Sequence, residues 1–167
     1  MSLEAMFMDL RPPVKGKKCN DLTSFDESLA KRAIETAKRA LQFVELGPPI
    51  IRRGPRGEAS VEIPLMYNGY ALDRIHCDPK SGQVMPKGVP HHIFGVEVDS
   101  KEISKRVSNI ISQLRVIEAV EYRDPEQAWV VPIAYGVFLI AHIKVSKDGS
   151  EIIPDYKLTE EARRNVI

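Results

Sequence analysis

One apolar stretch, residues 128–145, constrains the fold more than any other part of the sequence. It reads AWVVPIAYGVFLIAHIKV and contains no charged residue before its penultimate position. A membrane-spanning helix needs about 20 apolar residues, whereas this run is shorter and is interrupted by Pro132 and Gly136. Branched and aromatic side chains favour strands. We therefore expect two central strands, 128–135 and 137–145, divided at Gly136 by a bend, a bulge or a turn.

The second of these strands has one apolar face and one face that changes character. Side chains alternate along a strand, so Phe138 and Ile140 share a face with His142 and Lys144. We expect this face to reach solvent or a cleft near His142. Histidine titrates near neutral pH, which makes His142 a candidate for acid–base chemistry. The alternative is a hydrogen-bonded core histidine.

Composition limits the class of protein. The chain has 167 residues, 43% of them hydrophobic, and a formal net charge of +1, so one domain is the default and no global field attracts nucleic acid or membrane. The two cysteines provide no disulfide framework and no CxxC pair. Without a recognisable targeting segment or membrane span, a cytoplasmic location is expected. We predict an irregular N-terminal arm over residues 1–22 and a single α+β domain over residues 23–167.

Helical periodicity occurs in two places. Apolar residues recur at helical spacing from Leu29 to Val44, and Gly47 predicts the end of that helix. Asp99 with Glu102 is typical of a capping box and predicts a second helix. A short terminal helix is expected over residues 159–164.

The Asn-Gly pair at 68–69 indicates a β-hairpin with a two-residue type I′ turn. A regular register would pair Tyr67 with Tyr70, Leu65 with Leu72, Ile63 with Arg74, and Val61 with His76. Segments 92–98 and 116–122 read as strands around the second helix, which makes residues 92–122 a βαβ unit. For 116–122, a continuation of the helix is the alternative.

These elements together predict an α+β fold. It consists of a mixed, mostly antiparallel sheet of about seven strands, with two main helices and the short C-terminal helix packed on it.

Two basic groups favour an anionic partner. The first lies in the Pro/Gly-rich loop at 48–58 and comprises Arg52, Arg53 and Arg56. The second lies in the N-terminal arm and comprises Lys15, Lys17 and Lys18. Guanidinium groups bind phosphate in a bidentate manner, so we predict a binding module for nucleic acid or a phosphorylated ligand. Neither group contains an aromatic residue for base stacking, and a basic loop that aids solubility is the alternative.

The histidines and one cysteine support a second hypothesis. His76 and Cys77 end a predicted strand, and His91 and His92 begin the next one after a Pro/Gly-rich loop. Imidazole and thiolate suit zinc or a similar divalent metal, which predicts a small metal-dependent enzyme. Adjacent strand residues point to opposite faces, so His91 and His92 reach one ion only where the backbone is irregular. Hydrogen-bonded or exposed strand ends are the structural alternative.

Well-known catalytic and nucleotide-binding motifs are absent. The sequence has no P-loop, GxGxxG, GxSxG, HExxH or EF-hand pattern. Long apolar strands with an uncovered edge can pair with a second copy of the chain. An oligomeric subunit, in the form of a homodimer, is therefore the third functional alternative.

Overall fold

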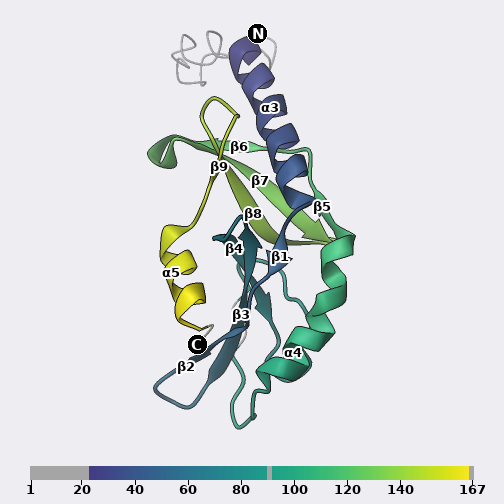
Figure 1. The fold of residues 1–167 in the computed structure, drawn as a ribbon, viewed down its shortest axis with the longest axis vertical. Helices are drawn as coiled ribbons and strands as arrows, with labels where there is room; N and C mark the ends of the chain where they lie inside the picture. The colour runs from purple at the N-terminus through teal and green to yellow at the C-terminus, as the bar shows by residue number, and fades with distance from the viewer. Residues whose placement is uncertain (1–22, 90–91, 166–167) are drawn as a thin grey trace, which may run out of the picture.

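A computed structural model describes residues 23–89 and 92–165 (Figure 1). The predicted N-terminal arm, with Lys15, Lys17 and Lys18, and the candidate ligand His91 lie outside the described residues. Within the described part, the chain folds into two antiparallel sheets and three α-helices. The broad α+β prediction is confirmed, but the prediction of one mixed sheet is wrong.

The four-stranded sheet is built around its longest strand. It comprises β1 (Glu45–Leu46), β2 (Ile50–Arg53), β3 (Ala59–Tyr67) and β4 (Tyr70–Cys77), with β3 paired to each of the others. The predicted hairpin turn is present, because Asn68 and Gly69 have positive φ angles of 50° and 81°. Tyr67 faces Tyr70 as expected.

Beyond that pair, the predicted hairpin register is wrong. A β-bulge between Leu65 and Met66 shifts the pairing by one residue. Ile63 consequently faces Ile75 instead of Arg74, and both isoleucines are buried. The same shift places His76 opposite Glu62 rather than opposite Val61.

The five-stranded sheet contains the apolar stretch. It comprises β5 (Leu114–Val116), β6 (Glu121–Arg123), β7 (Ala128–Tyr135), β8 (Phe138–Ser146) and β9 (Ile152–Ile153). The two central strands are confirmed as β7 and β8, which form a hairpin across Gly136, where φ is 59°. Strand β7 is buried over most of its length, whereas β8 starts exposed at Phe138 and Leu139 and ends with buried and half-buried residues in alternation.

The predicted βαβ unit does not form. Residues 92–98 contain no strand, and only Ile93 makes an isolated bridge, to Ala59. Helix α4 (Ser100–Val107) runs into a 3-10 helix, η1 (Ser108–Gln113), which leads into β5. Strands β5 and β6 both pair antiparallel with β7, one near each end. The ambiguous segment 116–122 is therefore part of an interrupted strand along one edge of β7.

The helix ends differ in part from expectation. Helix α3 (Thr23–Leu41) stops before the predicted Gly47, because residues 45–46 extend and pair with β3 as β1. The Asp99 cap of α4 is confirmed, since its side chain accepts from the backbone N–H groups of Lys101 and Glu102. Helix α5 (Tyr156–Arg164) starts earlier than predicted, because Asp155 caps it.

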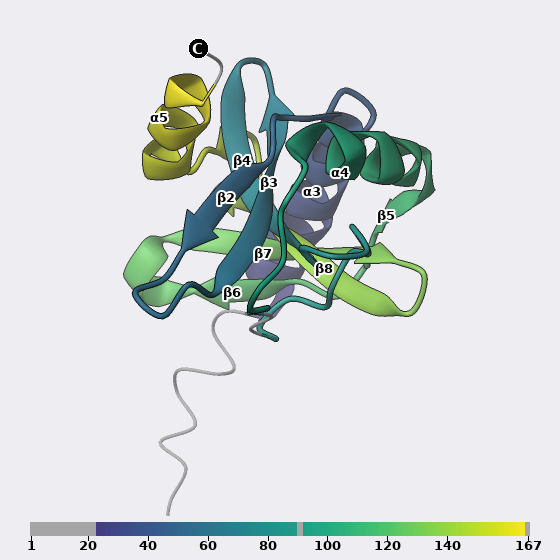
Figure 2. The same ribbon diagram turned by 90° about the horizontal axis from the view of Figure 1, so that it is seen from below.

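The two sheets share one core. Their strands cross at a steep angle when the molecule is seen from below (Figure 2). Helix α3 packs on β5, β7 and β8, and α5 packs on β3 and β4. The largest fully buried core side chains come from both sheets and include Ile63, Leu65, Ile75, Ile133, Ile140 and Ile143. Among the described residues, no helix is both long enough and apolar enough to cross a bilayer.

Candidate functional site

Arg52, the first residue of the predicted anion-binding group, is held in a network of ion pairs. Its Nε atom donates to Oε2 of Glu62 at 2.9 Å, and its Nη2 atom pairs with Glu161 on α5. Arg74 donates from Nη1 to the same Oε2 of Glu62, also at 2.9 Å. Glu62 is only 7% exposed. Arg52 therefore joins β2, β3 and α5, and its guanidinium is already occupied by protein carboxylates.

Arg53 and Arg56 are arranged differently. Both are exposed at the end of the β2–β3 hairpin, and no ion pair involves either side chain within residues 23–89 and 92–165. The backbone N–H of Arg56 donates to the Glu58 carboxylate at 2.9 Å. The two guanidinium groups thus remain open to an anion, while the loop backbone is held by Glu58.

Three of the predicted metal ligands do come together. His76, Cys77 and His92 line a small pocket of about 240 Å³ beside Glu62. Nevertheless, no group of three or more His, Cys, Asp or Glu side chains is placed to hold a metal ion in the described part of the chain. Cys77 is 1% exposed, and its burial raises the pKa of the thiol to about 12, so it is a poor thiolate ligand.

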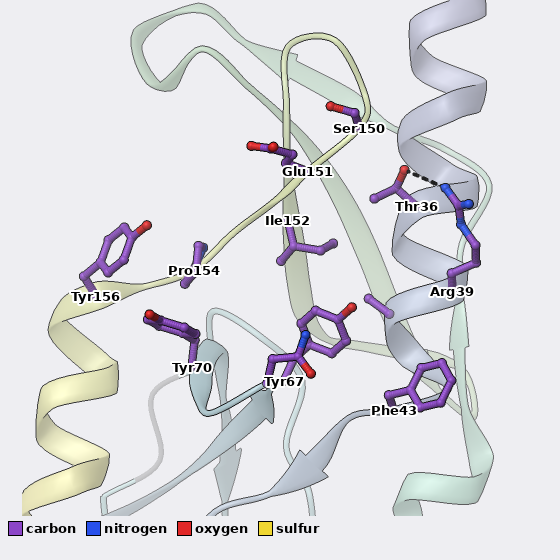
Figure 3. Close-up of a pocket in the computed structure, with 12 residues that line it drawn as sticks. Thr36, Arg39, Phe43, Tyr67, Tyr70, Ser150, Glu151, Ile152, Pro154 and Tyr156 are labelled. Atoms are coloured by element: carbon purple, nitrogen blue, oxygen red, sulfur yellow. Dashed lines mark hydrogen bonds between the residues drawn. The ribbon is translucent and has the colours of Figure 1, made fainter.

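A large cleft lies between α3, the β3–β4 turn and the start of α5 (Figure 3). We call it the aromatic cleft; its volume, about 640 Å³, exceeds that of the pocket beside Glu62 and that of the second cavity described below. Four aromatic side chains line it, namely Phe43, Tyr67, Tyr70 and Tyr156. Its polar lining comprises Thr36, Arg39, Asn68, Ser150 and Glu151. None of the four aromatic residues was selected as a site residue from the sequence.

Three of the four aromatic side chains are exposed, whereas Tyr67 is half-buried. Phe43 is 69% exposed, Tyr70 41% and Tyr156 65%. The Tyr70 and Tyr156 rings meet edge to face with centroids 6.1 Å apart, and the Arg163 guanidinium lies 5.5 Å from the Tyr70 centroid. Exposed apolar groups that gather in one place commonly mark a binding surface.

Local structure positions this cleft. The tight turn at 68–69 carries Tyr67 and Tyr70 on its two flanks, and the Asp155 cap fixes the first turn of α5, which bears Tyr156. Thr36 donates to the carbonyl oxygen of Gly149 and so ties α3 to the β8–β9 turn. The residues are distant in the sequence, and the tertiary fold brings them together.

A second cavity, of about 440 Å³, lies on the other side of the β9–α5 connection, and we call it the polar cleft. Pro154 and Tyr156 line both cavities. The charged or titratable side chains of the polar cleft are Asp73, Lys87, Arg123, Glu126, His142, Lys144, Asp155 and Tyr156. Half-buried His142 thus reaches a cleft, where the alternation of β8 predicted it.

Asp73 organises one wall of the polar cleft. Its Oδ2 atom accepts from the backbone N–H of His142 at 2.7 Å and from Nζ of Lys87 at 2.5 Å. Its Oδ1 atom accepts from the backbone N–H of Arg74 at 2.8 Å. One carboxylate therefore connects β4, β8 and the loop that follows β4.

The pH dependence of stability should reflect two histidines. Burial lowers the pKa of His76 and of His142, and the positive charge of Lys87 lowers the pKa of each further. The unfolded chain then binds protons more readily than the folded one, so their contribution to stability is complete above pH about 6.5 and is lost as pH falls. We expect the free energy of unfolding to decrease less between pH 7 and pH 5 in the double variant His76→Gln, His142→Gln than in the parent protein. Urea unfolding at a series of pH values measures this, and an unchanged slope contradicts it.

The alternation of β8 predicted solvent or a cleft beside His142, and His142 lines the polar cleft. The other residues of that cleft were not predicted. Asp73 contacts the backbone N–H of His142 and not its ring. The only available signal for the aromatic cleft was the Tyr67–Tyr70 pair beside the predicted turn. Searches against protein-family models, curated proteins and solved structures found no match to this chain.

Proposed function

We propose that this protein is a binding module for single-stranded nucleic acid, an anionic partner whose bases stack in the aromatic cleft. The observation that carries the proposal is the convergence of exposed Phe43, Tyr70 and Tyr156 on one cleft that has arginines at its margins. Proteins that bind single strands combine aromatic platforms with positive charge along the backbone path.

Arginines lie at two margins of the stacking surface. Arg39, on α3, is exposed, and within the described part of the chain its side chain makes one long hydrogen bond, to Thr36 Oγ1 at 3.4 Å. Arg163 lies over Tyr70 and donates to the carbonyl oxygen of Gly69 at 3.4 Å. Both guanidinium groups keep N–H donors for phosphate oxygens.

Arg53 and Arg56, at the end of the β2–β3 hairpin, extend the proposed nucleic-acid surface beyond the aromatic cleft. The C-terminal end of α5 lies beside β2 (Figure 1), and the Arg52–Glu161 pair joins the two elements. A strand that leaves the aromatic cleft past Arg163 can follow α5 toward Arg53 and Arg56. The predicted role of the loop in anion binding is therefore retained for these two arginines. Arg52 is assigned to the structural network instead.

The test is the binding of a fluorescein-labelled, single-stranded oligonucleotide of 12 nucleotides (about one OB-fold site length), measured by anisotropy. Loss of one stacked base costs about 1–3 kcal/mol, so Tyr70→Ala and Tyr156→Ala should each weaken binding about tenfold. Arg53→Ala with Arg56→Ala should weaken it less and should reduce its dependence on salt concentration.

Phe94 provides a matched control. It is 60% exposed but does not line the aromatic cleft, so Phe94→Ala should bind like the parent protein. The proposal would be refuted if Phe94→Ala and Tyr70→Ala lowered the affinity for the oligonucleotide equally. It would also be refuted if the affinity changed neither with salt concentration nor with either tyrosine substitution. The predicted homodimer and cytoplasmic location stay predictions.

A further inference from the structure

We propose that the polar cleft is a separate binding site for a phosphate group, as inorganic phosphate or a phosphate monoester. Cationic side chains from three parts of the chain converge on it: Lys87 from the loop after β4, Arg123 from β6, and Lys144 from β8. This site is independent of the aromatic cleft, although the two share the wall formed by Pro154 and Tyr156.

The cleft has unused hydrogen-bond donors. Lys87 donates to Asp73 and Lys144 pairs with Glu126 at 2.7 Å, yet each ammonium group has further N–H donors. Arg123 forms two long ion pairs, from Nη2 to Glu121 at 3.5 Å and from Nη1 to Glu126 at 3.8 Å, which leave further N–H groups of the guanidinium unused. Its planar fork is suited to two oxygens of a phosphate.

The carboxylates of the cleft, in contrast, are largely engaged. Both oxygens of Asp73 accept hydrogen bonds, from Lys87 and from two backbone N–H groups. Asp155 accepts from the backbone N–H of Leu158 at 2.9 Å and lies 4.0 Å from Arg74. Glu126 pairs with both Lys144 and Arg123. The three carboxylates thus balance the charge of the three cations, and the N–H donors that these pairs leave unused favour a ligand rich in acceptor oxygens.

His142 gives the site a proton donor that responds to the ligand. Its half-burial and the nearby Lys87 and Arg123 lower the pKa of the ring, while Asp73 and Glu121 oppose this. The other ionisable groups lining the cleft are Glu126, Lys144, Asp155 and Tyr156. An anion placed between Lys87, Arg123 and Lys144 offsets their positive charge and favours the imidazolium form. Phosphate binding should therefore be coupled to proton uptake by His142.

The experiment is a titration of the His142 ring protons by NMR, with and without inorganic phosphate, at an ionic strength held constant with chloride. Phosphate should raise the pKa of His142. In a phosphate titration at fixed pH, Arg123→Gln together with Lys144→Gln should weaken binding about tenfold or more. Both side chains are partly exposed, so these changes should leave the fold intact.

Two variants control for charge and for the neighbouring cleft. Lys147→Gln removes a positive charge from an exposed turn outside the cleft, and it should bind phosphate like the parent. Tyr70→Ala should also leave phosphate binding unchanged, which separates this site from nucleic-acid binding in the aromatic cleft. An unchanged His142 titration in phosphate, or equal binding by the Arg123/Lys144 double variant, would overturn the proposal.

Discussion

Replacing Glu62 by alanine is expected to lower the free energy of unfolding by about 3 kcal/mol or more. Removing one member of a buried ion pair typically costs about 3–5 kcal/mol, because the partner charge loses its counter-ion. Here one oxygen of a 7% exposed carboxylate serves both Arg52 and Arg74. The arginines are partly exposed and can recover some hydration, which places the expected loss near the lower limit.

Two comparisons separate the network from a simple loss of volume. Glu62→Gln keeps the shape and one acceptor oxygen, so urea unfolding should show a clearly smaller loss. Glu118→Ala removes the exposed partner of Lys38 and should have little effect, since exposed ion pairs contribute little. A Glu62→Ala variant as stable as Glu118→Ala would show that the network does not stabilise the fold.

The same network changes how arginine variants should be interpreted. Arg52→Ala alone should reduce stability, and a double-mutant cycle with Glu62→Ala should reveal coupling between the two side chains. Any loss of nucleic-acid binding in Arg52→Ala then reflects a displaced strand or helix. Arg53 and Arg56 are the appropriate residues for testing anion binding by the loop.

Replacing Leu158 by alanine is expected to cost about 3 kcal/mol, within the range for truncating a fully buried leucine. Leu158 is 0% exposed and packs with Ile50 and Ala71, apart from the main core. It is the largest buried side chain of α5. Loss of its methyl groups should weaken the packing of α5 on the four-stranded sheet more than it weakens the rest of the structure.

Hydrogen exchange and urea unfolding together test this prediction. In Leu158→Ala, the amides of residues 156–164 should exchange faster than in the parent, while those of β7 and β8 should stay protected longer. Glu160→Ala changes an exposed residue of the same helix and should alter stability by no more than about 0.5 kcal/mol. Unchanged protection of α5 in Leu158→Ala would contradict the role assigned to this contact.

Helix α5 matters because it supplies parts of both proposed sites. Tyr156 lines both clefts, Asp155 lines the polar cleft and caps the helix, and Arg163 lies over Tyr70. Undocking of α5 should therefore weaken nucleic-acid and phosphate binding together. Substitutions that weaken only one of the two activities must act within a single cleft.

Several local features could be predicted from the sequence, because each depends on neighbours along the chain. The alternation in 137–145 placed His142 on a face that opens into a cleft, and the Asn-Gly pair specified a turn with two positive φ angles. The Asp99 cap of α4 also follows from a short pattern. In each case the relevant atoms are separated by only a few residues.

The errors arose where distant segments compete for the same strand edge. The bulge after Leu65 moved Glu62 opposite His76 and allowed Ile63 to meet Ile75. Segment 92–98 had a strand-like pattern but found only one bridging partner, and α3 ended early because β1 pairs with β3. Which strands pair depends on how distant segments pack in the shared core. A local sequence pattern contains no information about those contacts.

By itself, the sequence determined the α+β class, the two central strands divided at Gly136, and the alternation that places His142 on the face of β8 that becomes polar. Only the tertiary structure decided that the strands form two sheets and that Arg52 is neutralised by Glu62 and Glu161. It also decided that aromatic side chains from the turn after α3, from the β3–β4 hairpin and from α5 line one cleft. The repeat with which side chains fall on one face is a property of each strand or helix and can be read from its own sequence. The two clefts, in contrast, are formed by contacts between elements far apart in the chain.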